Sequence, residues 1–443
     1  MAPQVGIPEQ AWEFLSDMVD NCVGRAVKGT KKEVVILAHK DGLYGGDNLI
    51  DEEAISWIST AFTSRGHRCS ILWVDDPQLV HEWRYPPVVK KAIEGADIIV
   101  NTPWQMPVEE IADFRDHIER SHLGDPERMT EQGRKDFPQT PDKQPKEATA
   151  EGYDAGTWMV RVFPVTADLM MTDWARTPYE LTIMLRHISS EPFMNLDKPT
   201  KFTMTDPNGT NLTGFTVNPV KREDEHGRGV PGMPYDSWRE NSSHYLPCPE
   251  WVHPPINCTH VNGVLYFTEM LPWWSKFIGI SPYWSDPIKI TVEESKMVGI
   301  EGGVEAKKLY AFLKEMEGKV GEKIWLFDTF HFGIHPNAHV NYYQCPNDIY
   351  RRTIEHMDCS NVHWHLGSAG GRPGYNFYPH ITGDIRKCTL TIEPEGGTPV
   401  PVYKDGWLCC QDDPRLAEIM KKYPGRPGIP VNPNTLPELK PGK

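Results

Sequence analysis

The sequence predicts an α/β N-terminal domain with a parallel sheet, over residues 1–200, and an α+β C-terminal domain, over residues 201–443. Two patterns carry this prediction. Short apolar runs alternate with helix-like segments over residues 33–100, as strands and crossover helices of a parallel sheet do. From Lys201 onward strand-like runs dominate, and one long helix-like segment interrupts them. A chain of 443 residues is also longer than one ordinary core supports.

The N-terminal domain contains apolar runs that end at polar turns. We expect strands at three of these runs, residues 33–38, 70–74 and 96–100. Residues 51–65 have the pattern of a helix, and Asp51 at the start is a typical N-cap. Further helices are expected over residues 88–94 and 178–188.

Residues 121–156 form a charged stretch that contains several prolines and lacks apolar periodicity. A segment of this composition buries too little apolar surface to build a core of its own. We therefore expect an inserted surface segment or an arm that contacts another subunit.

The C-terminal domain is expected to consist mostly of strands. One helix, over residues 305–316, follows the pair Gly302-Gly303. The runs that predict strands are residues 202–205, 263–267, 288–292, 323–327 and 388–392.

The composition excludes several classes of function. A net charge of −15 disfavours a nucleic-acid partner, because a phosphate backbone requires a basic face. No apolar run approaches membrane-spanning length, and the N-terminus lacks the pattern of a signal peptide. The nine cysteines contain no Cys-x-x-Cys pair, which disfavours a structural zinc site. We expect reduced thiols and a cytoplasmic location.

Histidines are concentrated in one stretch of the C-terminal domain. They are His331, His335, His339, His363, His365 and His380. Imidazole is the most common protein ligand of a catalytic transition metal, so this stretch predicts a metal centre. His363 and His365 alternate on a strand-like run and therefore point to the same face. Both are candidate ligands, and one of them is alternatively a hydrogen-bonding neighbour of the metal site.

Several segments, in a shared order, resemble the aminopeptidase T family of metallopeptidases. They are residues 205–212, 246–252, 263–265, 299–306, 332–338 and 362–367. Residues 380–406 are more similar to 2,5-dihydroxypyridine 5,6-dioxygenase, a non-haem iron enzyme that opens an aromatic ring. The resemblance covers residues 203–408 by motif and the first domain by architecture. It implies that the C-terminal α+β domain is the metal-binding catalytic domain.

The departures from the peptidase pattern limit what this resemblance implies. The peptidases hold two metal ions with two glutamates, two histidines and an aspartate. Glu250, His363 and His380 match three of these ligands, but Thr382 stands where the aspartate is expected. The position of the second glutamate also lacks a carboxylate. Two adjacent metal ions depend on bridging carboxylates, so a dinuclear peptidase site is disfavoured.

The dioxygenase holds a single iron with two histidines and an aspartate. The resemblance aligns His380 with its second histidine and makes His331 the nearest candidate for the first. Thr382 again replaces the aspartate.

Two ways of completing the metal site are open. Either Glu250 or Asp384 supplies a carboxylate, or His363 or His365 completes an all-histidine site. A neutral three-histidine set can still hold Fe(II), which is the expected metal, with Zn and Mn as alternatives. We predict His331, His363 and His380 as metal ligands, and catalytic roles for Glu250, His335 and His365.

Two enzymatic functions compete. The first is a mononuclear non-haem iron dioxygenase, an oxidoreductase of aromatic compound catabolism, which takes O₂ and a small hydroxylated aromatic or N-heteroaromatic substrate. The second is a Zn- or Mn-dependent hydrolase that cleaves an amide or aryl-amine bond with metal-activated water. A non-enzymatic assembly protein is disfavoured by the density of histidines.

The aromatic residues of the C-terminal domain favour a small ring as the substrate. Trp273, Trp274 and Tyr283 are expected to wall a pocket that fits a compact ring better than an extended peptide. The resemblance also implies a homo-oligomer.

Overall fold

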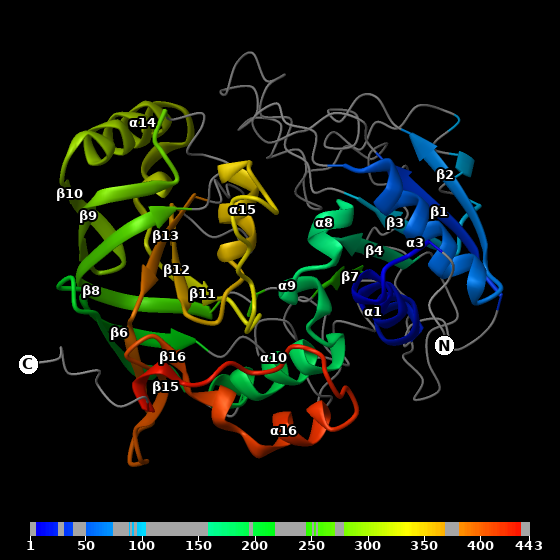
Figure 1. Ribbon diagram of the computed structural model, residues 1–443. Helices are drawn as coiled ribbons and strands as arrows, with labels where there is room; N and C mark the ends of the chain where they lie inside the picture. Colours follow the sequence, from blue (N-terminus) through cyan, green and yellow to red (C-terminus); the bar gives the residue numbers. More distant parts are fainter. Residues whose placement is uncertain are drawn as a thin grey trace, which may run out of the picture.

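The computed structural model describes residues 6–24, 31–38, 50–73, 88, 91–92, 95–102, 158–194, 198–217, 245–249, 252–253, 256–270, 279–367 and 381–435 (Figure 1). Some residues singled out by the sequence lie outside these ranges. They are the charged segment 121–156, Glu250, Trp273, Trp274 and His380.

The N-terminal part contains a five-stranded parallel sheet, as the sequence predicts. Its strands run in the order β2-β1-β3-β4-β7, and every pairing between neighbours is parallel. The strands are β1 (Glu33–Ala38), β2 (Arg68–Trp73), β3 (Ile98–Asn101), β4 (Trp158–Val162) and β7 (Tyr245–Cys248). The last of these follows residue 200 in the chain and still joins the first sheet. The domain boundary at residue 200 stays a prediction.

Several helices accompany this sheet, and one of them lies between β1 and β2 in the chain, as the sequence predicts. They are α1 (Glu9–Asp17), the π-helix η1 (Met18–Val23), α3 (Glu52–Ser64), α8 (Ala167–Met170), α9 (Asp173–Arg176) and α10 (Tyr179–Met194). The predicted N-cap is confirmed, because the Asp51 side chain accepts a hydrogen bond from the backbone N–H of Glu53 at 2.7 Å. The apolar face of α3 and the strands share one buried core.

The C-terminal part is built on an eleven-stranded antiparallel sheet in the order β11-β12-β13-β8-β6-β5-β14-β15-β16, with β9 paired to β8 and β10 paired to β9. The strands are β5 (Thr200–Thr205), β6 (Asn211–Val217), β8 (Ile256–Met270), β9 (Tyr283–Glu293), β10 (Lys296–Glu301), β11 (Thr329–Phe332), β12 (Asn361–Leu366), β13 (Ile381–Arg386), β14 (Thr389–Glu393), β15 (Val400–Lys404) and β16 (Trp407–Leu408). The fifteen-residue β8 pairs with β13 near its end and with β11 near its start. These pairings close β8, β11, β12 and β13 into a ring.

The described residues of this part also form helices. They are α14 (Val304–Val320), η3 (Gly321–Trp325), α15 (Asp348–Glu355), η4 (Cys409–Asp412), α16 (Pro414–Met420) and η5 (Pro433–Thr435). The predicted helix over residues 305–316 is confirmed as α14. The predicted strand over residues 323–327 is wrong, because this run continues from α14 as the 3₁₀ helix η3. Its apolar residues Ile324, Trp325 and Phe327 are nevertheless buried, and a short buried run has the same sequence pattern in either structure.

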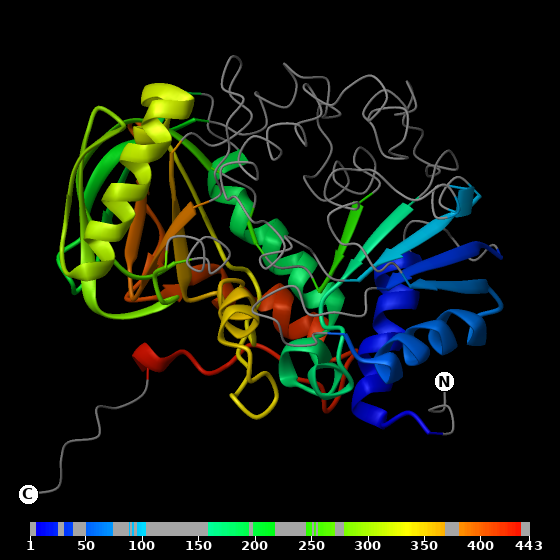
Figure 2. The same ribbon diagram turned by 90° about the horizontal axis from the view of Figure 1, so that it is seen from above.

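Helix α10 lies between the two sheets (Figure 2). It contacts η1 of the N-terminal part and α16, η4 and β15 of the C-terminal part. All nine cysteines are free thiols. Across the described residues, no helix is both long and apolar enough to cross a membrane.

Gly333, just after β11, lets two segments approach each other closely. Its backbone N–H donates to the carbonyl oxygen of Asn361 at 3.0 Å, and the N–H of His335 donates to that of Met357 at 2.9 Å. A Cβ atom at Gly333 would overlap the backbone of Met357 and Asp358. The loop after α15 is therefore held directly against the residues that follow β11.

We expect Gly333→Ala to lower the free energy of unfolding by about 1–3 kcal/mol, because backbone atoms cannot move aside as a flexible side chain can. Gly318→Ala is the matched control. Gly318 lies inside α14 with open space around it, and alanine there is expected to raise stability by about 0.5–1 kcal/mol. Denaturant unfolding of both variants measures the difference, and an unchanged midpoint for Gly333→Ala would contradict the close approach.

Candidate metal centre

A row of polar residues crosses four neighbouring strands of the second sheet. In the register of the sheet, His331 on β11 is opposite His363 on β12, and His363 is opposite Asp384 on β13. Asp384 is in turn opposite Glu269 on β8. Directly opposed residues project from the same face of a sheet, so these four side chains form one continuous row. His365, two residues along β12, shares their face, as predicted.

The alternate residues of the same strands point into the core. Phe330 and Trp364 are fully buried, with ring centroids 5.0 Å apart, and Phe327 stacks on Trp364 at 4.4 Å. The apolar face therefore fixes which side chains of β11 and β12 turn toward the polar row. Three members of the polar row, His331, His363 and Asp384, are at most 4% exposed, and Glu269 is half-buried.

Helix α15 reaches the row with two side chains that are one helical turn apart. Asn347 caps its start by accepting a hydrogen bond from the backbone N–H of Tyr350 at 2.8 Å. Arg352 and His356 have the i, i+4 spacing that places two side chains on one face of a helix. The guanidinium of Arg352 forms ion pairs with Asp384 and, at 3.0 Å, with Glu269.

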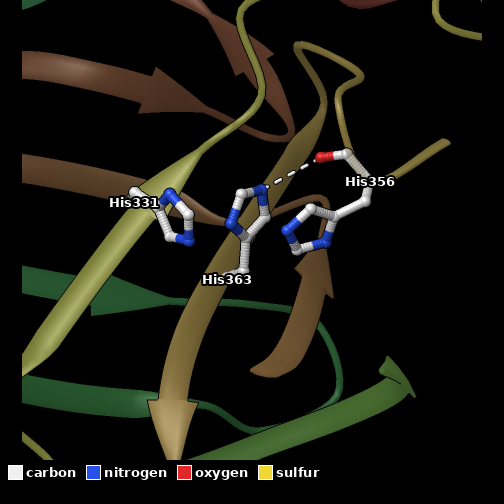
Figure 3. A group of neighbouring side chains, drawn as sticks. All are labelled: His331, His356 and His363. Atoms are coloured by element: carbon white, nitrogen blue, oxygen red, sulfur yellow. Dashed lines mark hydrogen bonds between the residues drawn. The ribbon is translucent and has the colours of Figure 1, made fainter. Parts of the chain in front are cut away.

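The imidazole rings of His331, His356 and His363 lie side by side, with His363 between the other two (Figure 3). The His356 and His363 rings stack with centroids 3.6 Å apart, and the His331 ring meets His363 edge-on at 4.2 Å. One nitrogen from each ring lies within 4.8 Å of the other two. All three residues are buried, so water reaches them little.

Hydrogen bonds determine which nitrogen of two rings carries a proton. His363 Nε2 lies 3.0 Å from the carbonyl oxygen of His356, which can only accept, so Nε2–H donates. His356 Nδ1 lies 3.0 Å from the carboxylate of Asp384 and donates in the same way. Each ring in its neutral form therefore keeps a lone pair on its other nitrogen, Nδ1 of His363 and Nε2 of His356.

His365 contacts His331 directly. The two Nε2 atoms lie 2.7 Å apart, so one nitrogen donates a proton to the lone pair of the other. Two nitrogens bound to one metal ion at 2.0–2.1 Å stand about 3 Å apart, close to this separation. A divalent cation could thus replace the shared proton with small movements of the rings.

The electrostatic environment keeps these groups in the states that metal binding requires. Burial, together with the neighbouring His356, His331 and His365, lowers the pKa of His363 well below its usual value, so the ring is neutral. Burial acts to raise the pKa of Asp384, but His356 and Arg352 more than offset it and hold that pKa below its usual value. The site thus combines the neutral imidazole of His363 with the buried, ionised carboxylate of Asp384.

The residues present fit a transition metal. His363 Nδ1 is buried, and within the described part of the chain it has no hydrogen-bond partner. Imidazole nitrogens suit Zn²⁺ and Fe²⁺, and metal-bound histidines usually donate their second N–H to a carbonyl or carboxylate, as His363 and His356 do. These two and His331 could hold an ion, with His365 as a fourth candidate.

The structure brings together three histidines that the sequence singled out, His331, His363 and His365. His335 lies elsewhere: it is fully buried against Trp174, with ring centroids 6.4 Å apart, and burial lowers its pKa to about 3. The ligand and catalytic roles assigned from the sequence stay predictions, including those of Glu250 and His380.

Two other polar side chains are held by carboxylates. Arg386 donates from Nε to both carboxylate oxygens of Glu269 at 3.1 Å. The Tyr283 hydroxyl, expected in a pocket wall, donates to Glu355 at 3.1 Å.

His356 is a residue of the site that the sequence patterns did not indicate. This residue lies at the C-terminal end of α15, outside the strand-like runs that drew attention to the other histidines. Its spacing of four residues from Arg352 was the available local signal. Its position beside His363 depends on the close approach at Gly333, which no local pattern shows.

No family model and no curated protein matches this sequence. The structure is similar to a solved structure, that of 2,5-dihydroxypyridine dioxygenase from Pseudomonas putida KT2440, with a TM-score of 0.52 and 12% sequence identity. The match covers 90% of this chain and 96% of that one. The resemblance to the aminopeptidase T family stays a prediction from motifs. The chain shares the fold of a solved dioxygenase, which agrees with the distant relationship that its C-terminal segment predicts.

Proposed function

We propose that this protein is a metal-dependent oxygenase that cleaves the ring of a small hydroxylated aromatic or N-heteroaromatic compound with O₂. The observation that carries the proposal is the buried group of His331, His356 and His363. The shared fold with a dioxygenase supports the same class of reaction. Mononuclear Fe(II) is the proposed cofactor, with Zn and Mn as alternatives.

A bound Fe(II) ion supplies the one-electron chemistry that O₂ requires to react with an aromatic ring. The protein supplies the arrangement around it. The in-register strands β11 and β12 hold His331 and His363 at a fixed separation, and α15 adds His356 from above the sheet. Rigid elements of this kind keep ligands in place more accurately than loops do.

Burial shapes the reaction in a second way. The side chains of the site are at most 6% exposed, so bulk water is largely excluded from it; they are His331, His356, His363 and His365. In such surroundings the charge of a bound metal ion acts strongly on a substrate oxygen. A compact ring with hydroxyl substituents suits this centre, since an ionised hydroxyl is attracted to a metal ion that neutral ligands leave positively charged.

The hydrolase alternative is not favoured by the geometry. A hydrolase needs a carboxylate that is free to accept a proton from water. Asp384, one of the two carboxylates that the sequence offers for this site, is already bound by Arg352 and His356. The other, Glu250, lies outside the described residues.

The first test concerns the metal ligands. We expect His331→Ala, His356→Ala and His363→Ala to lose most of the bound iron after purification without oxygen, because each removes one nitrogen from the site. Metal analysis measures the iron content. His253→Ala is the matched control: His253 is also buried, but it stacks on Phe332 and contacts Ser190 at 3.0 Å. Equal metal loss in this control, or full occupancy in the three variants, would contradict the assignment.

A second test asks whether His380 is a further metal ligand. If His380 binds the metal, as the resemblance implies, His380→Ala will lower iron content about as much as His356→Ala does. Full iron content in His380→Ala would remove it from the ligand set and leave the histidines of the described site.

The third test concerns the reaction. The iron-loaded protein should consume O₂ when supplied with hydroxypyridine- or catechol-like compounds, and His363→Ala should abolish this uptake. An oxygen electrode and mass spectrometry of the ring-opened product provide the measurement. Release of amines or amino acids from amide substrates, with no O₂ uptake, would instead identify a hydrolase.

A further inference from the structure

The two carboxylate oxygens of Asp384 have very different surroundings. Oδ2 accepts three hydrogen bonds: from His356 Nδ1 at 3.0 Å, from Asn361 Nδ2 at 3.3 Å and from the guanidinium of Arg352. Oδ1 is buried and accepts none from the described residues. The carboxylate is thus held by one oxygen, and that oxygen contacts His356.

Arg352 also fixes this arrangement. Its side chain is fully buried and bridges Asp384 and Glu269, which are opposed on β13 and β8. Glu269 is itself held by Arg386. Because breaking a buried ion pair leaves an uncompensated charge, Asp384 cannot rotate away from Arg352 without a large cost.

We infer that Asp384 is a positioning residue that acts on the metal through His356. The carboxylate accepts the proton of Nδ1 and so holds His356 in the tautomer whose Nε2 lone pair is available to the metal. Its negative charge also makes that nitrogen a stronger donor. This inference rests on the proposed metal site and assigns the role of the carboxylate within it.

Neutral histidine ligands do not balance the charge of a divalent ion. The carboxylate of Asp384 supplies a negative charge close to the site. A direct carboxylate ligand would neutralise part of this charge at the metal. Here the carboxylate is one hydrogen bond further out, so the metal keeps more positive charge toward the substrate. Asp384 still lowers the cost of placing a cation in a buried site.

The test measures the affinity of the metal-free protein for Co²⁺. The visible absorption bands of bound Co²⁺ report the number and type of its ligands. We expect Asp384→Ala to weaken Co²⁺ binding about 10–100-fold, the usual effect of removing a residue that orients a ligand. Asp384→Asn should weaken it clearly less, because the amide oxygen can replace Oδ2 as the acceptor for His356. The bands of Asp384→Asn should keep the wild-type pattern.

Two results would overturn the inference. If Asp384 binds the metal directly through Oδ1, Asp384→Asn will lose affinity as severely as Asp384→Ala, and its bands will change. If Asp384 has no role toward the metal, both variants will bind Co²⁺ as tightly as the wild type. Failure of the wild type itself to bind Co²⁺ would reject the metal site and the proposed function with it.

Asp17→Asn provides the control for a general loss of stability. Asp17 is also buried and accepts a hydrogen bond from an arginine, Arg426, at 3.1 Å, together with one from the backbone N–H of Tyr179. It belongs to α1 and touches none of the histidines of the site. Its substitution should lower the thermal unfolding temperature, as we also expect of Asp384→Asn, and leave Co²⁺ affinity unchanged. A loss of affinity in Asp17→Asn would show that the effect of Asp384 reports stability alone.

Discussion

The candidate site depends on the register between β11, β12, β13 and β8. Only in this register do His331, His363 and Asp384 stand opposite one another on one face. A slip by one residue would bring Phe330 or Trp364 to that face and send the histidines into the core. The aromatic packing of Phe327, Phe330 and Trp364 on the other face opposes such a slip. The aromatic core on one face of these strands thus sets the geometry of the polar site on the other face.

The position of helix α15 depends on the same register, because ion pairs of Arg352 attach the helix to the sheet. Arg352 is fully buried, and a buried guanidinium is stable only when carboxylates surround it. Asp384 and Glu269 meet this requirement because they are opposed on adjacent strands, so one nitrogen of Arg352 reaches both. The next turn of the helix then brings His356 to the same aspartate. An interaction that fixes how the helix docks therefore also delivers a candidate ligand.

The sequence predicted the features that arise from local patterns. Asp51 was identifiable as an N-cap from its place before an amphipathic run, and His363 and His365 from their alternation on a strand. The run over residues 323–327 was wrongly predicted as a strand, because a short apolar run is typical of buried strands and buried short helices alike. Its position directly after α14 was the sign of a helix. His356 could not be found in this way. Its place beside His363 results from strand register and from the close approach at Gly333, both of which are set by contacts distant in sequence.

The buried imidazoles impose a cost that a metal ion would relieve. The pKa of His363 is lowered mainly by burial, and within the described chain its Nδ1 has no partner. A buried polar atom without a partner destabilises the folded protein, whereas the unfolded chain exposes the same atom to water. Coordination would satisfy this nitrogen in the folded state only, so metal binding would add to the stability of the fold. The aromatic core holds the strands in register without any contribution from a metal ion. The fold itself therefore arranges the ligands of the site. Preorganisation of this kind favours tight binding, since little of the binding free energy is spent on ordering the ligands.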